Sequence, residues 1–313
     1  MATYLVTGGC GFIGSHLCKA LLSRGDAVRV LDDLSTGSLT NLPAAAAFTQ
    51  GDVADPRLVC QAITGVDGCF HLAAIASVEL SNRDWIRTHR TNLTGAITVF
   101  SAAIAAGPVP VVYASSAAVY GDCPSLPLRE TSDKRPISAY GADKFGCELH
   151  ARVGSKVHGL RSVGLRLFNV YGPGQDPKSP YSGVISIFCE RIRRGEPIEI
   201  FGDGNQTRDF IFVADVVTGL MRAMDTRLPG EPVFNICTGG ATSVLELAQT
   251  VASLCGRDLA IRFRATREGE VAHSYGDPTA ARQALGLGSP TELRIGLAAT
   301  LAWLEGVRDA SRS

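Results

Sequence analysis

A tyrosine and a lysine four positions apart form the residue pair best suited to catalysis, Tyr140 and Lys144 in the segment YGADK. On a helix, this spacing places both side chains on the same face. A lysine ammonium beside a phenol favours the phenolate, which can accept a proton from an alcohol near neutral pH. The alternative is an ordinary surface contact between the two side chains, so the interpretation depends on which elements lie beside them.

Two serines follow an apolar run upstream of this pair. Ser115 and Ser116 come directly after Val109–Ala114, which has the length and composition of a buried strand. Ligands of doubly wound sheets bind at the carboxyl ends of the strands, so a hydroxyl here could bridge a substrate hydroxyl and Tyr140. Simple capping of a turn is the alternative for an isolated Ser-Ser pair.

A glycine-rich turn near the start of the chain has the spacing of a phosphate-binding loop. Gly8, Gly11 and Gly14 follow G-x-x-G-x-x-G, and Gly9 with the last two also satisfies G-x-G-x-x-G. Glycines at such positions permit a tight turn, close approach of backbone N–H groups to a pyrophosphate, and contact between helix and strand. Asp32, at the end of the next apolar run, can accept hydrogen bonds from a ribose diol and repels a 2′-phosphate. The pattern predicts a dinucleotide site that prefers NAD to NADP.

Apolar runs of strand length alternate with helical patterns along the first half of the chain. Continuous apolar strands of this kind are typical of a parallel sheet covered by helices on both faces. The predicted strands are Tyr4–Thr7, Ala27–Leu31, Gly68–Ala73, Val109–Ala114 and Ser162–Leu167, and the predicted helices are Ile13–Ser23, Thr91–Ala106 and Ala139–His158. After Asn169 the alternation is less clear, with helices near Ile185–Arg194, Ala214–Met224, Val244–Leu254 and Leu293–Leu304. We therefore predict an α/β chain with a Rossmann-like, doubly wound parallel sheet and a smaller C-terminal substrate-binding lobe.

Composition and charge exclude several classes of protein. The 313 residues carry 30 Lys and Arg against 30 Asp and Glu, which disfavours a broad basic surface for nucleic acid or anionic lipid. The nine cysteines include no C-x-x-C pair, so we expect no metal site and a reducing compartment. The uncharged stretch Leu93–Gly121 is interrupted by Gly107 and Pro108, and no basic leader precedes the first strand. We expect a cytoplasmic protein without a membrane or nucleic-acid partner.

The order of these motifs resembles the extended short-chain dehydrogenases/reductases, and specifically the nucleotide-sugar 4-epimerases of the UDP-galactose/UDP-N-acetylglucosamine type. The likeness covers nearly the whole chain and is carried by TGGCGFIGSHL (7–17), HLAAIASV (71–78), SSAAVYGD (115–122), YGADK (140–144), LRLFNVYGPGQDP (165–177), FGDGNQTRDFIFVADVV (201–217) and REGEVAHSYGD (267–277). It implies an NAD-binding domain at 1–168, with a return of the chain near 208–236, and a mostly UDP-sugar-binding domain at 169–313. It also implies tightly bound NAD and a homodimer formed through the helices at Thr91–Ala106 and Ala139–His158.

The resemblance further implies a mechanism and a set of site residues. Tyr140 takes the proton of the sugar 4-hydroxyl while C4 gives its hydride to NAD, Ser116 hydrogen-bonds the same oxygen, and Lys144 holds the nicotinamide ribose. The 4-keto sugar then rotates about its pyrophosphate link and takes the hydride back on its other face. The implied cofactor-binding residues are Gly8, Gly11, Phe12, Ile13, Gly14, Asp32, Asp33, Ser35, Asp52, Val53, Leu72, Ala73, Ala74, Asn92, Tyr140 and Lys144. The implied substrate-binding residues are Ser77, Ser116, Tyr140, Asn169, Arg208, Arg267, Glu270 and Ser274.

Two positions narrow the expected substrate. Ala117 and Ala118 stand where related dehydratases and decarboxylases include a carboxylate for an additional proton transfer, so a lyase of that type is disfavoured. Ser274 aligns with the position that walls the C2 side of the sugar, where a tyrosine would crowd an N-acetyl group. Its small size leaves room for UDP-GlcNAc and UDP-GalNAc, besides UDP-Glc and UDP-Gal, unless the neighbouring Tyr275 folds back into that space.

Three alternatives remain open at this stage. A UDP-glucuronate 4-epimerase would need a cation near the sugar C6, for which the chain offers Lys178, Arg191, Arg193 and Arg194. An NAD-binding module without turnover would usually lack the tyrosine or the lysine, and both are present here. A net sugar-nucleotide oxidoreductase would release NADH and depend on added cofactor.

Overall fold

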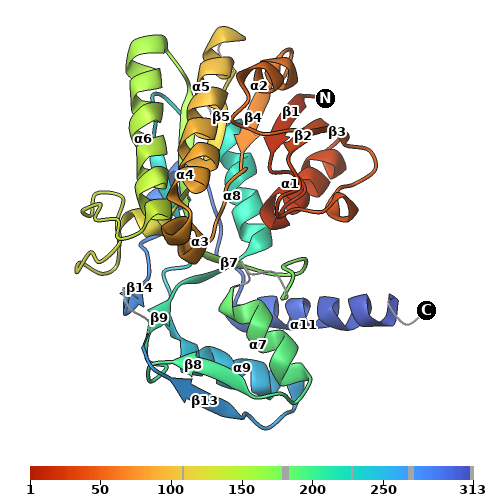
Figure 1. The fold of residues 1–313 in the computed structure, drawn as a ribbon, viewed down its shortest axis with the longest axis vertical. Coiled ribbons are helices and arrows are strands. Elements are labelled where there is room, and N and C mark those ends of the chain that lie inside the picture. Colours follow the sequence, from red (N-terminus) through yellow and green to blue (C-terminus); the bar gives the residue numbers. More distant parts are fainter. Residues whose placement is uncertain (108, 178–182, 227, 267–270, 311–313) are drawn as a thin grey trace.

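A parallel sheet of seven strands forms the centre of the larger part of the molecule in this computed structural model, which describes residues 1–107, 109–177, 183–226, 228–266 and 271–310 (Figure 1). The strand order is β11-β6-β5-β4-β1-β2-β3, and every neighbouring pair is parallel. The chain starts in the middle, builds outward to one edge, and then returns to build the other. The strands are β1 (Thr3–Thr7), β2 (Ala27–Asp32), β3 (Ala47–Gln50), β4 (Gly68–His71), β5 (Val111–Ser116), β6 (Ser162–Leu167) and β11 (Val233–Ile236). The reversal between β1 and β4 creates the crevice in which doubly wound sheets bind ligands.

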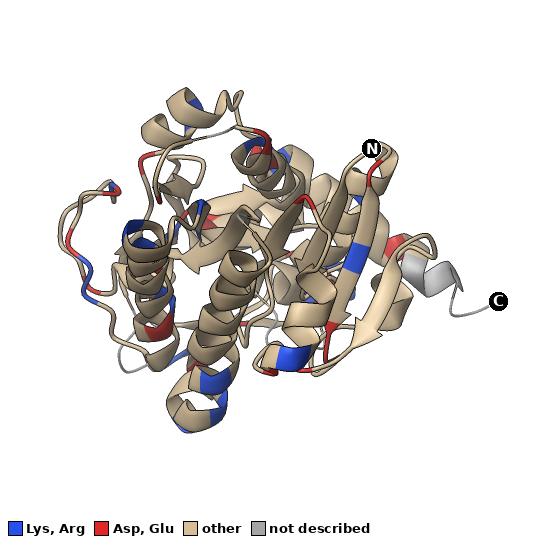
Figure 2. Ribbon diagram, turned by 90° about the horizontal axis from the view of Figure 1, so that it is seen from above, with Lys and Arg blue, Asp and Glu red and all other residues tan. Residues whose placement is uncertain are grey.

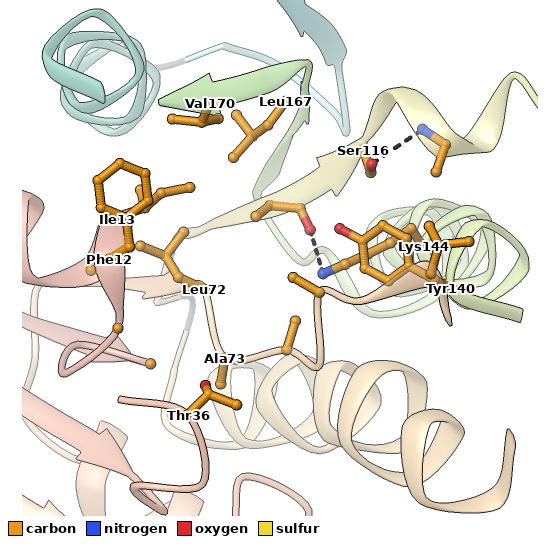
Figure 3. A pocket seen from close by; sticks show the side chains of 18 of the residues that line it. Phe12, Ile13, Thr36, Leu72, Ala73, Ser116, Tyr140, Lys144, Leu167 and Val170 are labelled. Atoms are coloured by element: carbon orange, nitrogen blue, oxygen red, sulfur yellow. Dashed lines mark hydrogen bonds between the residues drawn. The ribbon is translucent and has the colours of Figure 1, made fainter. Parts of the chain in front are cut away.

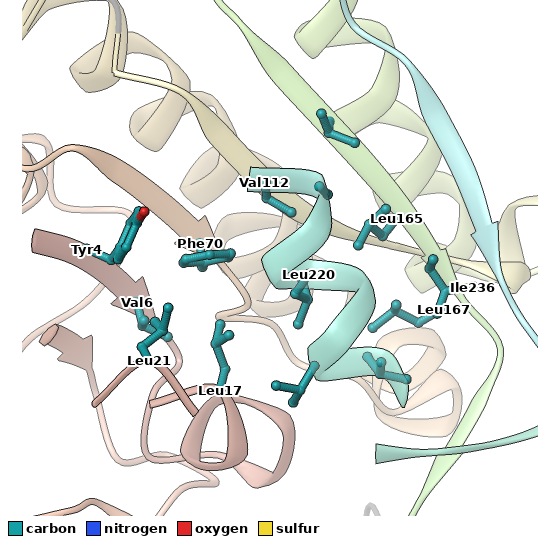
Figure 4. Packing of buried hydrophobic residues seen from close by; sticks show 14 of the residues in the cluster. Tyr4, Val6, Leu17, Leu21, Phe70, Val112, Leu165, Leu167, Leu220 and Ile236 are labelled. Carbon is teal, nitrogen blue, oxygen red and sulfur yellow. The ribbon is translucent and has the colours of Figure 1, made fainter. Parts of the chain in front are cut away.

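Helices cover both faces of this sheet because the strand side chains are apolar on both sides. On one face, α1 (Phe12–Ser23) and α8 (Val213–Asp225) pack with Leu17, Leu21 and Leu220 against Phe70 and its neighbours (Figure 4). On the other face lie α2 (Pro56–Ile63), α5 (Gly95–Ala105) and α6 (Ala139–His158). The predicted Rossmann-like, doubly wound sheet is confirmed.

Shorter sheets and further helices form a second, smaller hydrophobic core on the carboxyl-end side of the large sheet (Figure 1). Its strands are β7 (Asn169–Tyr171) with β10 (Phe210–Phe212), β8 (Ile198–Phe201) with β13 (Ile261–Arg264), and β9 (Thr207–Arg208) between β12 (Thr242–Ser243) and β14 (His273–Ser274). Its helices are α7 (Val184–Arg193), α9 (Val244–Cys255) and α11 (Leu293–Ala310). Because β11 and α8 belong to the large sheet and its covering layer, the chain crosses between the two cores more than once.

The predicted element boundaries differ from the structure at informative places. Strand β5 runs through Ser116, so the two serines are its last residues rather than the turn after it. The predicted helix Thr91–Ala106 is a π-helical turn, η2 (Arg90–Thr94), followed by α5. Sequence reasoning missed α2 and three other short helices, because periodicity needs a longer window than these provide. The others are α3 (Val78–Arg83), α4 (Trp85–His89) and α10 (Thr279–Leu285).

Acidic and basic residues are interspersed when the ribbon is seen from above (Figure 2). This distribution agrees with the balance of 30 positive and 30 negative side chains in the sequence. None of the described helices is long and apolar enough to cross a membrane. Among the described residues, no group of three or more His, Cys, Asp or Glu side chains is placed to hold a metal ion.

Candidate active site

A cavity of about 720 Å³ lies along the carboxyl ends of the large sheet and extends to β7, β9 and β14 of the smaller core. The two 3₁₀ turns near it are η1 (Leu39–Asn41) and η3 (Ala117–Val119). The cavity brings together residues that are more than 260 positions apart in the chain. Of the predicted site residues, it is lined by Gly8, Gly11, Phe12, Ile13, Gly14, Asp32, Asp33, Ser35, Asp52, Val53, Leu72, Ala73, Ala74, Ser116, Tyr140, Lys144, Asn169, Arg208 and Ser274.

The glycine turn is packed so closely that two of its glycines leave no room for a side chain. Gly8 has φ +74°, and a Cβ there would lie 2.7 Å from the backbone nitrogen of Ala73. A Cβ on Gly14 would overlap the carbonyl oxygen of Gly8, because α1 packs directly on the turn. Gly11 differs, since the nearest atom to its Cβ would be that same oxygen at 3.3 Å and its open side is the cavity. Because Gly11 is the N-cap residue of α1, no side chain caps the first N–H groups of this helix, which leaves a site for an anion.

Asp32 is anchored at the end of β2 beside this turn. One carboxylate oxygen accepts a hydrogen bond from the backbone N–H of Cys10 at 2.9 Å, and the other accepts from Leu34 at 2.9 Å. Burial raises the pKa of Asp32, and these two hydrogen bonds oppose that shift. The carboxylate is thereby held against the cavity wall, where it can accept further hydrogen bonds from a ribose.

Two further acidic residues line the same end of the cavity. Asp33 accepts hydrogen bonds from the backbone N–H and the hydroxyl of Ser35, which shapes the loop after β2. Asp52 pairs with Arg90 at 2.8 Å and accepts a hydrogen bond from the backbone N–H of Ala54. Asp52 lines the cavity, and its side chain is 40% exposed.

The tyrosine, the lysine and the strand-end serine meet at the other end of the cavity. Lys144 is 2% exposed, and its Nζ donates a hydrogen bond to the carbonyl oxygen of Ala114 at 2.8 Å. The same nitrogen lies 5.9 Å from the centroid of the Tyr140 ring. Ser116 Oγ accepts a hydrogen bond from Ala118 N–H at 3.1 Å. Figure 3 shows Tyr140, Lys144 and Ser116 across the cavity from Phe12 at the start of α1.

The first turn of helix α6 is held in place by a local cap and by hydrogen bonds to a neighbouring helix. Ser138 caps the helix by accepting a hydrogen bond from Gly141 N–H at 3.1 Å. The backbone N–H of Tyr140 donates to Ser81 Oγ on α3 at 3.1 Å, and Ala139 N–H donates to the side chain of Asn82 at 3.2 Å. The tyrosine is thus positioned by α3, an element that the sequence analysis missed.

Two predicted site residues lie away from the cavity lining. Asn92 is fully buried in η2, where its side-chain amide accepts a hydrogen bond from Ile75 N–H at 2.8 Å and donates one to Ile75 C=O at 3.1 Å. It therefore holds the loop after β4, whose residues form the cavity wall. Ser77 caps α3 by accepting a hydrogen bond from Leu80 N–H. The family resemblance did not distinguish these residues, which support the cavity wall, from residues that line the cavity.

The smaller core contributes a compact polar wall. Strands β9 and β14 pair in parallel with Arg208 opposite Ser274, so both residues face one region of the cavity. Arg208 Nη1 donates to the carbonyl oxygen of Thr207 at 2.8 Å, and Asn169 donates to the carbonyl oxygen of Asp209 at 3.1 Å. The predicted Arg267 and Glu270 lie outside the described residues, as does Lys178.

Several lining residues escaped the sequence analysis because only the folded chain brings them together. They come mainly from loops and short elements: Thr36, Asn41, Ala76, Val78, Asn82, Thr91, Ile137, Ser138, Val170, Gln175, Asp176, Gly183 and Val271. Of these, Ala76, Val78, Val170, Gln175, Asp176 and Val271 belong to segments that carry the likeness to relatives, which was the available signal.

Comparison with known proteins agrees with this architecture. A sequence model described as the NAD dependent epimerase/dehydratase family matches residues 4–237. The UDP-glucose 4-epimerase of Mycolicibacterium smegmatis is 37% identical over 304 residues, which cover 95% of this chain and 96% of that protein.

Two solved structures superpose on nearly the full length of the chain. The UDP-glucose 4-epimerase from Thermotoga maritima, solved with UDP-glucose, has a TM-score of 0.94 and 36% identity, and covers 98% of this chain and 99% of its own. The UDP-N-acetylglucosamine 4-epimerase from Methanobrevibacter ruminantium M1, solved with UDP-N-acetylmuramic acid, has a TM-score of 0.93 and 32% identity. The superposition covers 98% of this chain and 99% of that protein.

The doubly wound sheet, the glycine turn and the Ser–Tyr–Lys cluster define an NAD-dependent enzyme of the short-chain dehydrogenase/reductase type. Within this class, the chain belongs to the NAD dependent epimerase/dehydratase family. The resemblance inferred from the sequence is confirmed, and the protein is an NAD-dependent epimerase, an isomerase by reaction class.

Proposed function

We propose that this protein is a UDP-sugar 4-epimerase that interconverts UDP-GlcNAc and UDP-GalNAc, and also UDP-Glc and UDP-Gal, through a transient 4-keto sugar. The choice of N-acetylated UDP-sugars as substrates depends on one observation: Ser274, a small residue beside Arg208, forms part of the cavity wall. Tyr275 is not among the described residues that line the cavity, and its backbone carbonyl accepts a hydrogen bond from Leu128 N–H at 2.9 Å. The space next to the small serine is therefore not taken by its large neighbour.

The residues of the cavity support a division of roles. When bound, NAD supplies a reversible hydride acceptor for the sugar C4. Tyr140 accepts the proton of the 4-hydroxyl and later returns it, while Ser116 Oγ hydrogen-bonds the same oxygen. Lys144, held by Ala114 C=O at 2.8 Å, places a positive charge next to the phenol and is positioned to donate to the nicotinamide ribose.

The same arrangement supports a division of ligand binding between the two cores. We assign the glycine turn to the NAD pyrophosphate and Asp32 to the adenosine ribose, within an NAD-binding domain of residues 1–168 and the returning segment 208–236. The remainder of 169–313 holds the UDP-sugar, with Asn169 toward the UDP. Arg208, the first residue of the returning segment, also points toward the UDP in this proposal. An arginine suits this task because its guanidinium forms charge-assisted hydrogen bonds to phosphate.

The alternatives receive less support from the cavity. A glucuronate carboxylate needs a cation, but Arg193 and Arg194 both pair with Glu190, and Arg191 Nη1 donates to Pro197 C=O at 3.3 Å. None of these three arginines is among the described residues that line the cavity. Ala117 and Ala118 do line it, so these two positions offer no carboxylate for a dehydratase step.

A homodimer and a cytoplasmic location form part of the same proposal. On α6, Leu149, Val153 and Val157 are 50%, 53% and 67% exposed, and on α4, Trp85 and Ile86 are 65% and 87% exposed. These are exposed apolar side chains of the kind that a second copy would cover. Light scattering should give a dimer mass for the wild type and a smaller mass for Val153→Glu. All nine cysteines are free, which suits a reducing compartment.

The deciding experiment uses purified protein without added NAD. UDP-GlcNAc, UDP-Glc and UDP-GlcA are supplied separately, and products are resolved by chromatography and proton NMR. Conversion of UDP-GlcNAc to UDP-GalNAc is the expected result. Conversion of only UDP-Glc or only UDP-GlcA would support the proposed mechanism but reject the N-acetylated sugars as substrates. Turnover only on added NAD, with accumulation of NADH, would reject the epimerase assignment.

A further inference from the structure

The end of strand β5 is tied to helix α6 at two successive residues. The Ala114 carbonyl oxygen accepts a hydrogen bond from Lys144 Nζ at 2.8 Å. The next residue, Ser115, donates from its hydroxyl to Glu148 Oε1 at 2.5 Å. Lys144 and Glu148 are one helical turn apart on the same face of α6. The residue that follows Ser115 is Ser116, so these two bonds, together with the pairing of β5 and β6, hold the strand end that carries the Ser116 hydroxyl.

Glu148 is itself held by a buried arginine on the neighbouring strand β6. Arg166 Nε donates to Glu148 Oε1 at 2.8 Å, and its Nη2 donates to Oε2 at 2.7 Å, which makes a bidentate pair. The side chains of Arg166 and Glu148 are 4% and 6% exposed. Both charges are almost fully buried, and the two hydrogen bonds from Arg166 orient the carboxylate so that Oε1 faces Ser115.

The same arginine also holds the turn that follows Ser116. Arg166 Nη1 donates to the hydroxyl of Tyr120 at 2.7 Å and to the carbonyl oxygen of Glu130 at 3.1 Å. The Tyr120 hydroxyl donates onward to the side-chain oxygen of Asn235 at 2.6 Å. The guanidinium carbon lies 4.9 Å from the centroid of the Tyr120 ring, so the turn is held by both polar and ring contacts. The chain is thus fixed on both sides of Ser116 by one ion pair.

Stability is a weak reason for such a pair, because desolvation of two charges commonly cancels their attraction. Positioning is a stronger reason, because a displacement of about 1 Å in a reacting group can cost a large factor in rate. We propose that Ser115, Glu148 and Arg166 are positioning residues that hold Ser116 at the cavity that Tyr140 also lines. The inference rests on the proposed function, in which Ser116 Oγ hydrogen-bonds the sugar 4-oxygen.

The test is a double-mutant cycle between Ser115→Ala and Ser116→Ala. Ser162→Ala is the matched control, because Ser162 is 3% exposed on the adjacent strand and its hydroxyl has no hydrogen-bond partner among the described residues. We expect Ser115→Ala to lower kcat on the order of tenfold with KM within about twofold. In the Ser116→Ala background, the same change should lower kcat by less than about twofold, because the group being positioned is absent. Equal losses in both backgrounds would refute the positioning role.

A second variant removes the ion pair without leaving a lone buried charge. Glu148→Met combined with Arg166→Met keeps the side-chain volume, and such replacements commonly fold. We expect a melting temperature close to that of the wild type together with a loss of kcat similar to that of Ser115→Ala. Unchanged kcat in this folded variant would overturn the proposal.

Hydrogen–deuterium exchange gives a readout that does not depend on turnover. Amides of the segment 111–120 should exchange faster in Ser115→Ala than in Ser162→Ala. If the wild type converts no UDP-sugar, the proposed function fails, while this measurement still decides whether Ser115 holds the strand end. Equal exchange in the two variants would then reject the positioning role by itself.

Discussion

Replacement of Gly11 by alanine separates the cofactor-binding role of the glycine turn from its structural role. Gly11 precedes α1 with φ −77° and ψ 177°, which an alanine adopts without strain. The added methyl would meet only the Gly8 carbonyl oxygen, at 3.3 Å, and otherwise projects toward the cavity. The protein should therefore fold, while the methyl group occupies space over the N–H groups that we assign to the pyrophosphate.

The expected size of both effects follows from this geometry. Loss of conformational freedom in the unfolded chain favours alanine by about 0.4–1 kcal/mol, and the tight contact with Gly8 opposes it. The melting temperature should therefore change by only a few degrees. Loss of one charge-assisted hydrogen bond to the pyrophosphate costs about 1.5–3 kcal/mol, which weakens NAD binding about 10- to 150-fold.

The assay measures the dissociation constant of NAD by titration of stripped protein, alongside thermal unfolding of the NAD-free form. Gly288→Ala is the control, because a Cβ there meets no atom within 4 Å. Gly14→Ala is the contrast, since its Cβ would overlap the Gly8 carbonyl and should destabilise the fold itself. Unchanged NAD affinity in a stable Gly11→Ala protein would show that the turn does not hold the pyrophosphate.

Three further predictions concern the chemistry, the substrate and the stability of the fold. Tyr140→Phe should abolish turnover and leave UDP-sugar binding nearly intact by calorimetry; retained activity above a few per cent would remove Tyr140 from its role. Ser274→Tyr should depress kcat/KM for UDP-GlcNAc far more than for UDP-Glc, and equal losses would show that this wall does not select the substrate. Burial, assisted by Lys144, lowers the pKa of His71 to about 3. The imidazole of the unfolded chain titrates near pH 6.5, so between pH 6.5 and pH 3 the unfolded state binds a proton that the folded state does not. The stability that is present above pH 6.5 is therefore lost as the pH falls toward 3. At pH 5 this loss is about 2 kcal/mol relative to pH 7.5. Urea unfolding at pH 5 and pH 7.5 should give a smaller difference in the free energy of unfolding for His71→Asn than for the wild type. An unchanged difference would exclude His71 as the source of this pH dependence.

Local sequence determined the elements that carry the chemistry. Ser138 and Gly159 delimit α6 through an N-terminal cap and a left-handed C-terminal residue, so the helix spans 139–158 in both prediction and structure. The glycine spacing determined a turn that only residues without a side chain can form where α1 packs on it. Apolar strands between helices determined a parallel sheet, and its topology placed Ser116, Tyr140 and Asp32 at the same edge.

Tertiary structure decided which side chains face the cavity and which support it. Asn92 and Ser77 occupy positions that relatives suggested for ligand contact, yet one binds the backbone of Ile75 and the other caps α3. The pairing of Ser274 with Arg208 and the contact of Glu148 with Ser115 join residues 33 to 66 positions apart. Periodicity and capping act over a few residues, whereas such contacts depend on how strands align and helices pack. For this reason the sequence alone determined the class of chemistry, and only the folded chain decided the wall of the sugar site and the support of its reactive serine.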